Sequence, residues 1–267
     1  MHPEENSLAS SGQILSDFGQ EALRVVSEGE RQGILLRLLG ATAIKLHCPE
    51  YGYLFEKFGR NLTDLDFATY GKFRGKLEKF FLNHGYRSDR RTSYYFGQAR
   101  HRYFDDLNHR VVDIFFDKLN FCHVVPFGGR LELDNPTITL ADVLLEKMQI
   151  VRINEKDIRD TMIMLREHDI RDEEKEAINV KYVSKLLGDD WGFYYTATTN
   201  LNNVKQFLEK YEALTDGDRQ DVRAKIDTLL KRIEDESKTM KWKIRAKIGT
   251  SKKWYTEVEE FKADLKK

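Results

Sequence analysis

The sequence predicts an α+β protein in which a mixed sheet with flanking helices is followed by an α-helical C-terminal region. Two observations support this fold class. Apolar runs with β-branched or aromatic residues, such as 64–70 and 110–116, have the composition and length of strands. Beyond Pro136 the chain contains no proline, so its second half can be helical without interruption.

The first half is expected to mix helices with strands. Residues 13–29 are predicted to form an amphipathic helix because four apolar side chains recur on one stripe. These are Ile14, Phe18, Leu23 and Val26. The run 34–39 is too short for periodicity to distinguish a strand from a buried helical turn. Helices are expected at 41–47 and at 73–85, the second with its aromatic side chains inward and Gly85 as its stop.

Strands are expected at 64–70, 92–96, 102–105 and 110–116. The pattern changes near Pro136, where Thr139 and an acid three residues later, Asp142, have the form of a capping box that opens a helix. Helices are then expected at 140–152, 156–168, 173–187, 190–211 and 216–236.

These elements suggest four parts of the chain. Residues 1–12 are polar and expected to be disordered. We expect an α/β core at 13–135, a helical domain at 136–213, and a helical hairpin with a basic and aromatic tail at 214–267.

Composition restricts the class of protein. The formal net charge is zero, so only a local patch can attract nucleic acid or a membrane surface. Cys48 and Cys122 are too few for a disulfide framework, and a reducing, cytoplasmic setting is the natural interpretation. The N-terminus lacks the features of a signal peptide, and no apolar stretch reaches the roughly 20 residues of a membrane span.

Three aspartates carry the strongest chemical signal. Asp64 and Asp66 are one residue apart on an expected strand, so both side chains point to the same face. Carboxylates that close repel each other unless a cation lies between them, and magnesium prefers such hard oxygen ligands. Asp113 lies in a second apolar strand. The three acids together are typical of metal-dependent phosphoryl or nucleotidyl transfer.

A glycine turn precedes the aspartate pair by about twenty residues. Gly40, Ala41 and Thr42 are followed by an expected helix, whose N-terminal N–H groups suit a phosphate. The turn is not a P-loop, because no Gly-Lys-Ser/Thr follows at the required spacing. An ordinary turn explains these residues equally well.

The order of these motifs resembles the nucleotidyltransferase fold of the polymerase-beta-like superfamily. In that fold a glycine turn, here 38–43, is followed by an Asp-x-Asp led by Ser or Thr, here 60–67, and by a third acid, here 112–114. Residues 146–148, Arg152 and 154–160 also resemble the helical motif of the abortive-infection-type nucleotidyltransferase toxins. The resemblance covers roughly 34–165.

The resemblance implies a site and an activity. Asp64, Asp66 and Asp113 would be catalytic and would bind magnesium, while Gly40, Ala41, Thr42 and Lys147 would bind the nucleoside triphosphate. Asp113 would also help to deprotonate the acceptor hydroxyl. The family usually has Gly-Gly or Gly-Ser at the turn, so Ala41 removes a hydroxyl that Thr42 or backbone N–H groups would have to replace. A toxin function with an antitoxin partner, or a role in phage defence, is implied in the same way.

The C-terminal tail combines basic and aromatic residues. This pattern suits single-stranded RNA and predicts contacts through six residues. They are Lys241, Trp242, Lys243, Arg245, Lys247 and Trp254. The alternative is an appendage whose tryptophans pack on the acidic helix expected at 216–236.

Two functions therefore remain open. The first is a magnesium-dependent transfer of a nucleotidyl group to a hydroxyl, with an RNA 3′ end favoured over a protein or a small molecule as acceptor. The alternative is a catalytically weak nucleotide-binding or interaction module, in which Ala41 marks a degraded phosphate site.

Overall fold

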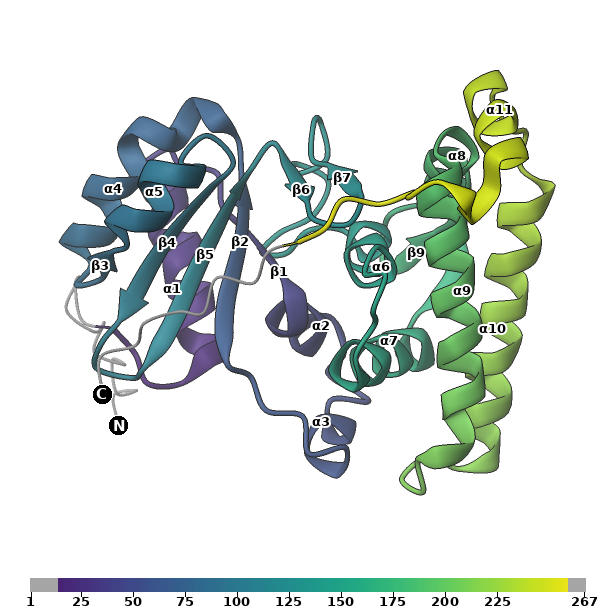
Figure 1. Cartoon of the computed structure of the whole chain (residues 1–267). Helices are drawn as coiled ribbons and strands as arrows, with labels where there is room; N and C mark the ends of the chain where they lie inside the picture. Colours follow the sequence, from purple (N-terminus) through teal and green to yellow (C-terminus); the bar gives the residue numbers. More distant parts are fainter. Residues whose placement is uncertain (1–13, 259–267) are drawn as a thin grey trace.

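The computed structural model describes residues 14–258 and has mixed α and β structure. A sheet lies at one end and a helical region at the other, and the last described residues return from the helices toward the sheet (Figure 1). Residues 1–12, for which disorder is expected, and the end of the predicted tail at 259–267 lie outside the described residues.

The main sheet is mixed, with the strand order β1-β2-β5-β4-β3. Its strands are β1 (Arg37–Leu39), β2 (Asp64–Thr69), β3 (Arg87–Ser88), β4 (Arg100–Asp105) and β5 (Arg110–Phe116). Strands β2 and β5 are parallel, and every other neighbouring pair is antiparallel. The open choice for the run 34–39 is settled as a strand for its second half only, β1. The strands expected at 64–70, 102–105 and 110–116 are confirmed within one or two residues.

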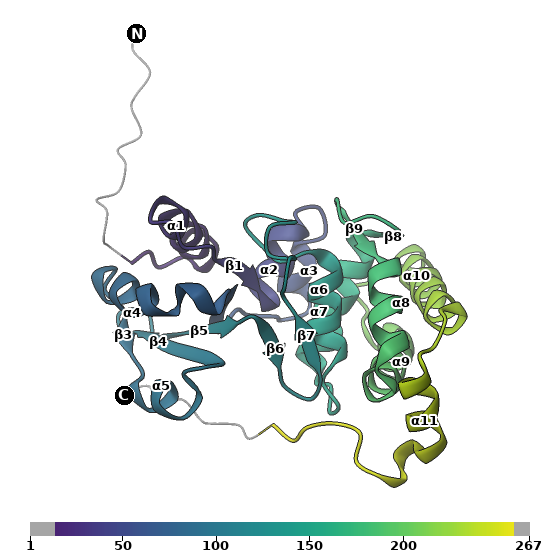
Figure 2. The same cartoon turned by 90° about the horizontal axis from the view of Figure 1, so that it is seen from above.

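Helices cover both faces of this sheet. Helices α1 (Phe18–Arg31) and α4 (Arg74–Asn83), the latter preceded by the short turn η1 (Gly71–Phe73), lie on one face, and α5 (Arg90–Phe96) lies on the other (Figure 2). Helix α4 buries Leu77, Phe80 and Phe81 as expected. The predicted stripe of α1 is wrong at Leu23, which is 42% exposed, because the buried face is centred on Ala22, Val25 and Val26.

Helix α5 corrects the expectation of a strand at 92–96. Aromatic and β-branched residues favour a strand at this place. The side chain of Asp89, however, accepts hydrogen bonds from the backbone N–H groups of Arg91 and Thr92 and so caps a helix. Tyr94 and Tyr95 are 82% and 66% exposed, so no core contact holds these residues in an extended form.

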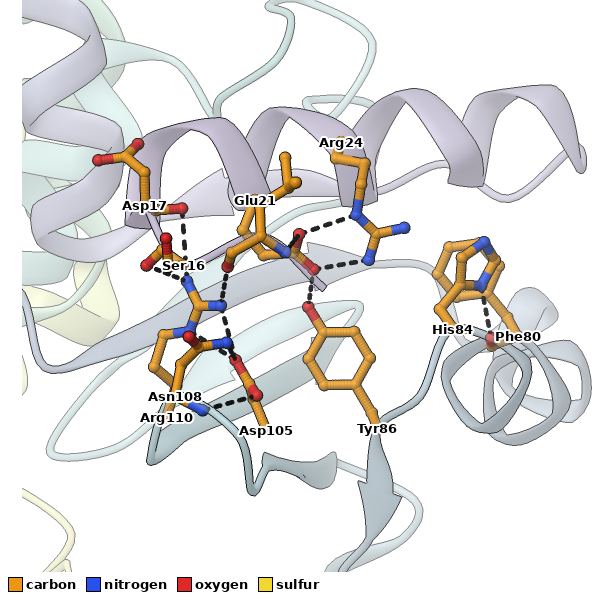
Figure 3. A network of polar contacts seen from close by, with 11 residues as sticks. Ser16, Asp17, Glu21, Arg24, Phe80, His84, Tyr86, Asp105, Asn108 and Arg110 are labelled. Carbon is orange, nitrogen blue, oxygen red and sulfur yellow. Dashed lines mark hydrogen bonds and ion pairs between the residues drawn. The ribbon is translucent and has the colours of Figure 1, made fainter. Parts of the chain in front are cut away.

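A buried polar network attaches α1 to the sheet (Figure 3). Glu21 accepts hydrogen bonds from Tyr86 Oη and from Arg24, whose Nε lies 2.8 Å from Glu21 Oε2. Arg110 binds Asp105 at 2.6 Å and donates to the backbone carbonyl of Leu15, just before the helix. The network joins the segment before α1 to the turn between β4 and β5.

The helical region begins with α2 (Gly40–His47) and α3 (Tyr53–Lys57) and continues after the sheet. Its further helices are α6 (Leu140–Met148), α7 (Glu155–Glu167), α8 (Val180–Asp189), α9 (Trp191–Phe207), α10 (Asp216–Asp235) and α11 (Met240–Ile248), with the 3-10 turns η2 (Leu208–Lys210) and η3 (Gly249–Ser251). Thr139 caps α6 by accepting from the Asp142 N–H, as expected. No helix within 14–258 combines the length and apolar character that a membrane span requires.

Two small sheets were not expected. Strands β6 (Lys118–Asn120) and β7 (Val124–Pro126) pair antiparallel after β5, and β8 (Asp169–Arg171) pairs parallel with β9 (Ala177–Asn179). The second pair overturns the first part of the expected helix at 173–187, because residues 173–179 form a turn and a strand. The side chain of Asn179 caps α8 by accepting from the Tyr182 N–H, so the helix begins only at Val180.

The sheet and the helices share one apolar core. Leu38 of β1 exchanges backbone hydrogen bonds with Pro136 and Ile138, so the chain that enters the helical region pairs with the sheet edge. Helix α2, which follows β1 directly, contacts α6 and α7. The junction of β1 and α2 therefore lies between the sheet and the helices, and the candidate site lies next to it.

Candidate functional site

The three predicted carboxylates meet at one cavity on the face of the sheet that carries α5. Asp66 and Asp113 are direct partners in the parallel pairing of β2 with β5, and Asp64 precedes Asp66 by two residues on the same face. All three line a cavity of about 320 Å³ together with Glu146, Arg100 and Arg102. The predicted convergence of Asp64 and Asp66 with Asp113 is present.

Gly40 brings the β1–α2 junction against this cluster. Its φ of +71° lies in the left-handed region that favours glycine, and a Cβ there would meet Asp66 Oδ2 at 3.0 Å. Its N–H donates to Glu146 Oε2 at 2.9 Å. The first N–H of α2 is therefore already bound to a carboxylate. None of the three residues predicted to bind phosphate, Gly40, Ala41 and Thr42, lines the cavity, and Thr42 is buried.

Asp66 is the least compensated carboxylate of the cluster. Burial raises the pKa of Asp66 well above its ordinary value, and the carboxylates of Asp64, Asp113 and Glu146 raise it further. Arg100 opposes this shift. Among the residues that the structure describes, none donates a hydrogen bond to the Asp66 side chain. Asp66 is half-buried, and a carboxylate there without a donor is costly as an anion, so it readily takes up a proton or an external cation.

Glu146 completes the acidic wall from helix α6. Burial raises its pKa to about 7, against the opposing effects of Lys147 and the Gly40 N–H. A carboxyl that titrates near neutrality beside an uncompensated aspartate is typical of a functional site.

Asp113 differs from Asp66 because two arginines on β4 hold it. Arg102 pairs with Asp113 across the strands and donates from Nε to Oδ1 at 2.9 Å and from Nη2 to Oδ2 at 3.1 Å. Arg100 donates to the same oxygens, at 2.8 and 2.5 Å. Both oxygens of Asp113 are thus engaged by guanidinium groups.

Lys147, predicted to bind nucleotide, lies one residue after Glu146 but outside the cavity lining. Its Nζ is 3.0 Å from Asp160 Oδ2 and 3.1 Å from Asp157 Oδ1, and Arg60 also binds Asp160. Burial alone would lower the pKa of Lys147, but the two aspartates outweigh it and raise the pKa. The motif residues at 157 and 160 therefore hold this lysine in an ion network.

Residues 252–258 run from the helices toward the sheet on the side that carries α5 (Figures 1 and 2). The Thr256 N–H donates to the Cys122 carbonyl at 3.0 Å. Thr256 and the two residues after it form one wall of a second cavity, of about 370 Å³, which shares Arg100 and Arg102 with the first. The second cavity therefore adjoins the one that the carboxylates line.

The tail tryptophans pack on the helical region, as the alternative expected, but on α9 instead of the helix at 216–236. Trp242 lies edge-on to Tyr194, with ring centroids 5.1 Å apart, and Trp254 donates from its indole N–H to Thr196. Arg245 binds the carbonyls of Gly249 and Lys252. Of the six residues predicted to bind RNA, three have exposed side chains. These are Lys241, Lys243 and Lys247.

The residues fit magnesium in a restricted sense. Within 14–258, no three His, Cys, Asp or Glu side chains are arranged so that they could hold a metal ion by themselves. Magnesium bound with a nucleotide usually takes only one or two protein carboxylates, and the substrate phosphates complete its shell. Asp64 and the uncompensated Asp66 supply that pair, whereas both Asp113 oxygens are occupied by arginine.

The contacts of three site residues were not predicted from the sequence. Arg100 and Arg102 are two residues apart on a strand, so their side chains share a face. The pairing of β4 with β5 that brings them to Asp113 is not visible in the sequence. Glu146 lies beside the predicted Lys147, but only the packing of α6 against α2 shows which of the two enters the cavity. Comparisons with protein-family models, curated proteins and solved structures find no match to this chain.

Proposed function

We propose that this chain is a magnesium-dependent nucleotidyltransferase that moves a nucleotidyl group from a nucleoside triphosphate to an acceptor hydroxyl. The observation that carries the proposal is the pair Asp64 and Asp66 on one face of β2, with Asp66 lacking a donor. The glycine junction, the mixed sheet and the neighbouring Asp113 support the same assignment.

Asp64 and Asp66 would hold the metal. When bound, magnesium supplies electrostatic stabilisation of the charge on the transferring phosphate. Asp113 lies beside Asp66 and would accept the proton of the acceptor hydroxyl as its oxygen attacks the α-phosphorus. The bond from the α-phosphorus to the bridging oxygen breaks, and pyrophosphate leaves with the electron pair.

An RNA 3′ end is the acceptor that we favour. The exposed lysines of α11 and the cationic cavity beside the carboxylates support it, since basic side chains attract a phosphate backbone. A toxin role with an antitoxin partner in the cytoplasm belongs to the same proposal and depends on the resemblance of the motifs.

The second candidate is a nucleotide-binding or interaction module with weak or no catalysis. A specific observation favours it, because three groups expected to serve the nucleotide are engaged by protein partners. Asp113 is bound by two arginines, Lys147 by two aspartates, and the Gly40 N–H by Glu146.

The test is label transfer from each of the four nucleoside triphosphates, in magnesium, to a mixture of total RNA and protein. We expect label in RNA with the wild type and none with Asp64→Ala/Asp66→Ala. The matched control is Asp227→Asn, which removes an exposed carboxylate of α10 paired with Lys205, and which should transfer label normally. Transfer by the double variant would overturn the proposal, and nucleotide binding without any transfer would favour the second candidate.

A further inference from the structure

The two arginines of β4 carry more positive charge than their partner can neutralise. Arg100 and Arg102 stand two residues apart on one face of the strand, and both direct the fork of the guanidinium group at Asp113. One carboxylate compensates one guanidinium, so the group keeps one excess positive charge. Arg100 also lies over the ring of Phe115, 5.1 Å from its centroid, which fixes its plane.

The wall of the same cavity that β2 and α6 form has the reverse imbalance. Asp64, Asp66 and Glu146 place three carboxyl groups there, and Asp66 has no hydrogen-bond donor among residues 14–258. One wall therefore lacks an anion and the other lacks a cation. A ligand that carries both, a divalent metal on a polyphosphate, would compensate the two walls together.

The arrangement selects phosphate by geometry as well as by charge. A guanidinium fork matches two oxygens of a phosphoryl group in the same way as it matches a carboxylate. Two forks side by side can hold adjacent phosphoryl groups, whereas a single carboxylate ligand offers only one set of oxygens. Arg100 has a side-chain exposure of 26%, so an incoming anion can reach it from the cavity.

We propose that Arg100 and Arg102 form the polyphosphate-binding site of the chain, and that the phosphates take the place of Asp113 on the two guanidinium groups. This inference rests on the proposed nucleotidyl transfer and adds an order of events to it. Asp113 is held by the arginines before the nucleotide binds, and its oxygens become free when the phosphates arrive.

The site is tested by calorimetric titration of inorganic triphosphate, in excess magnesium, into the full chain. Arg100→Gln and Arg102→Gln should each weaken binding by about tenfold or more, because each removes a charge-assisted fork. Arg87→Gln is the matched control, since Arg87 lies on the adjacent β3 in an exposed pair with Asp106, and it should bind normally. If Arg102→Gln, at a buried position, fails to fold, Arg102→Lys replaces it, and Arg100→Gln is measured in either case.

Asp113→Asn is the decisive variant, because the direction of its change in triphosphate affinity separates two roles of Asp113. If the aspartate competes with phosphate for the arginines, its removal should tighten triphosphate binding by about tenfold. If Asp113 is only a metal ligand, the same variant should weaken binding of the metal–triphosphate complex. Weaker binding, or triphosphate affinity unchanged in both arginine variants, would overturn the inference.

The two proposals fail separately. Triphosphate binding with this pattern but without label transfer from any nucleotide would leave a polyphosphate site and remove the transferase. Label transfer together with unchanged triphosphate affinity in Arg100→Gln and Arg102→Gln would keep the transferase and remove the arginine site.

Discussion

Two groups of carboxylates in this protein differ in burial and in what surrounds them. In the network under α1, Glu21 accepts from Arg24, Tyr86 and a backbone N–H, and Asp105 accepts from Arg110 and Asn108 (Figure 3). In the cavity, Asp66 accepts from no described residue and faces other carboxylates.

The difference separates a structural role from a chemical one. A buried charge that is fully paired fixes the position of the elements that carry it. If one member of such a pair is removed, the other is left as an unpaired buried charge, which destabilises the protein. A half-buried carboxylate without a partner, such as Asp66, raises the free energy of the folded protein until a proton or a cation binds it. The comparison predicts that substitutions in the two groups have opposite effects on stability and activity.

The largest expected effect is the loss of transfer in Asp66→Asn. Removal of a metal ligand should lower the rate of label transfer by about 1,000-fold, or roughly 4 kcal/mol of transition-state stabilisation. The free energy of unfolding should stay the same or rise, because repulsion among the carboxylates is relieved. Urea denaturation and the label assay on the same preparation measure both. Transfer at the wild-type rate, or a marked loss of stability, would contradict the comparison.

Arg110→Met should have the reverse result. It removes the cation from buried Asp105 and should destabilise the protein by about 3–5 kcal/mol. The rate of transfer per folded molecule should not change, since Arg110 is on the far side of the sheet from the cavity. Arg87→Gln is again the control, and loss of its exposed pair with Asp106 should cost less than about 1 kcal/mol. A loss of only that size in Arg110→Met would mean that the network adds little to stability.

Glu146→Gln gives an intermediate effect that depends on pH. Because the folded pKa of Glu146 is about 7, raised from an ordinary value of 4.5, the folded state keeps a proton that the unfolded state releases between these values. The stability that this group contributes therefore falls as the pH rises from 4.5 to 7. We expect Glu146→Gln to match the wild type at pH 4.5 and to exceed it by about 2–3 kcal/mol at pH 8.

Urea denaturation at the two pH values measures this difference. The glutamine carbonyl can still accept from the Gly40 N–H, so the comparison isolates the charge. Glu212→Gln, at an exposed position, is the matched control. Its free energy of unfolding should be close to that of the wild type at both pH values. A constant difference for Glu146→Gln would show that its carboxyl does not titrate in this range.

The sequence was sufficient to predict the α+β class and the position of Asp64, Asp66 and Asp113. The apolar composition of their strands and the alternation of side chains between the two faces of a strand are local properties that do not depend on distant contacts. It was not sufficient for the helix α5, where the cap at Asp89 prevailed over the strand propensity of the following residues. It also failed for the strand pair β8 and β9, each only three residues long.

The partners of charged residues were harder to predict than their positions. Lys147 was expected to bind nucleotide from the resemblance of its motif, yet Asp157 and Asp160 reach it from the next helix. Arg100 and Arg102 bind Asp113 only because β4 pairs with β5 in one register, and a shift of one residue would turn them to the other face. Ion pairs between elements depend on packing, which sequence spacing does not specify.

The smallest effect on the fold is expected from the basic face of α11. Lys241→Gln/Lys243→Gln/Lys247→Gln changes three exposed side chains, so the stability should stay within about 0.5 kcal/mol of the wild type. If these lysines contact RNA phosphates, the binding of single-stranded RNA should weaken, and its dependence on the logarithm of salt concentration should become less steep by about 2. Fluorescence anisotropy at several salt concentrations measures both quantities.

The control for this variant carries the same change of charge elsewhere. Lys45→Gln/Lys79→Gln/Lys185→Gln removes three exposed lysines from other helices and should bind RNA with nearly the wild-type slope. Equal losses in the two triple variants would mean that RNA responds to total charge and not to α11. A loss confined to the α11 variant would add a third class to the comparison, because these charges are neither paired in the core nor gathered at the cavity.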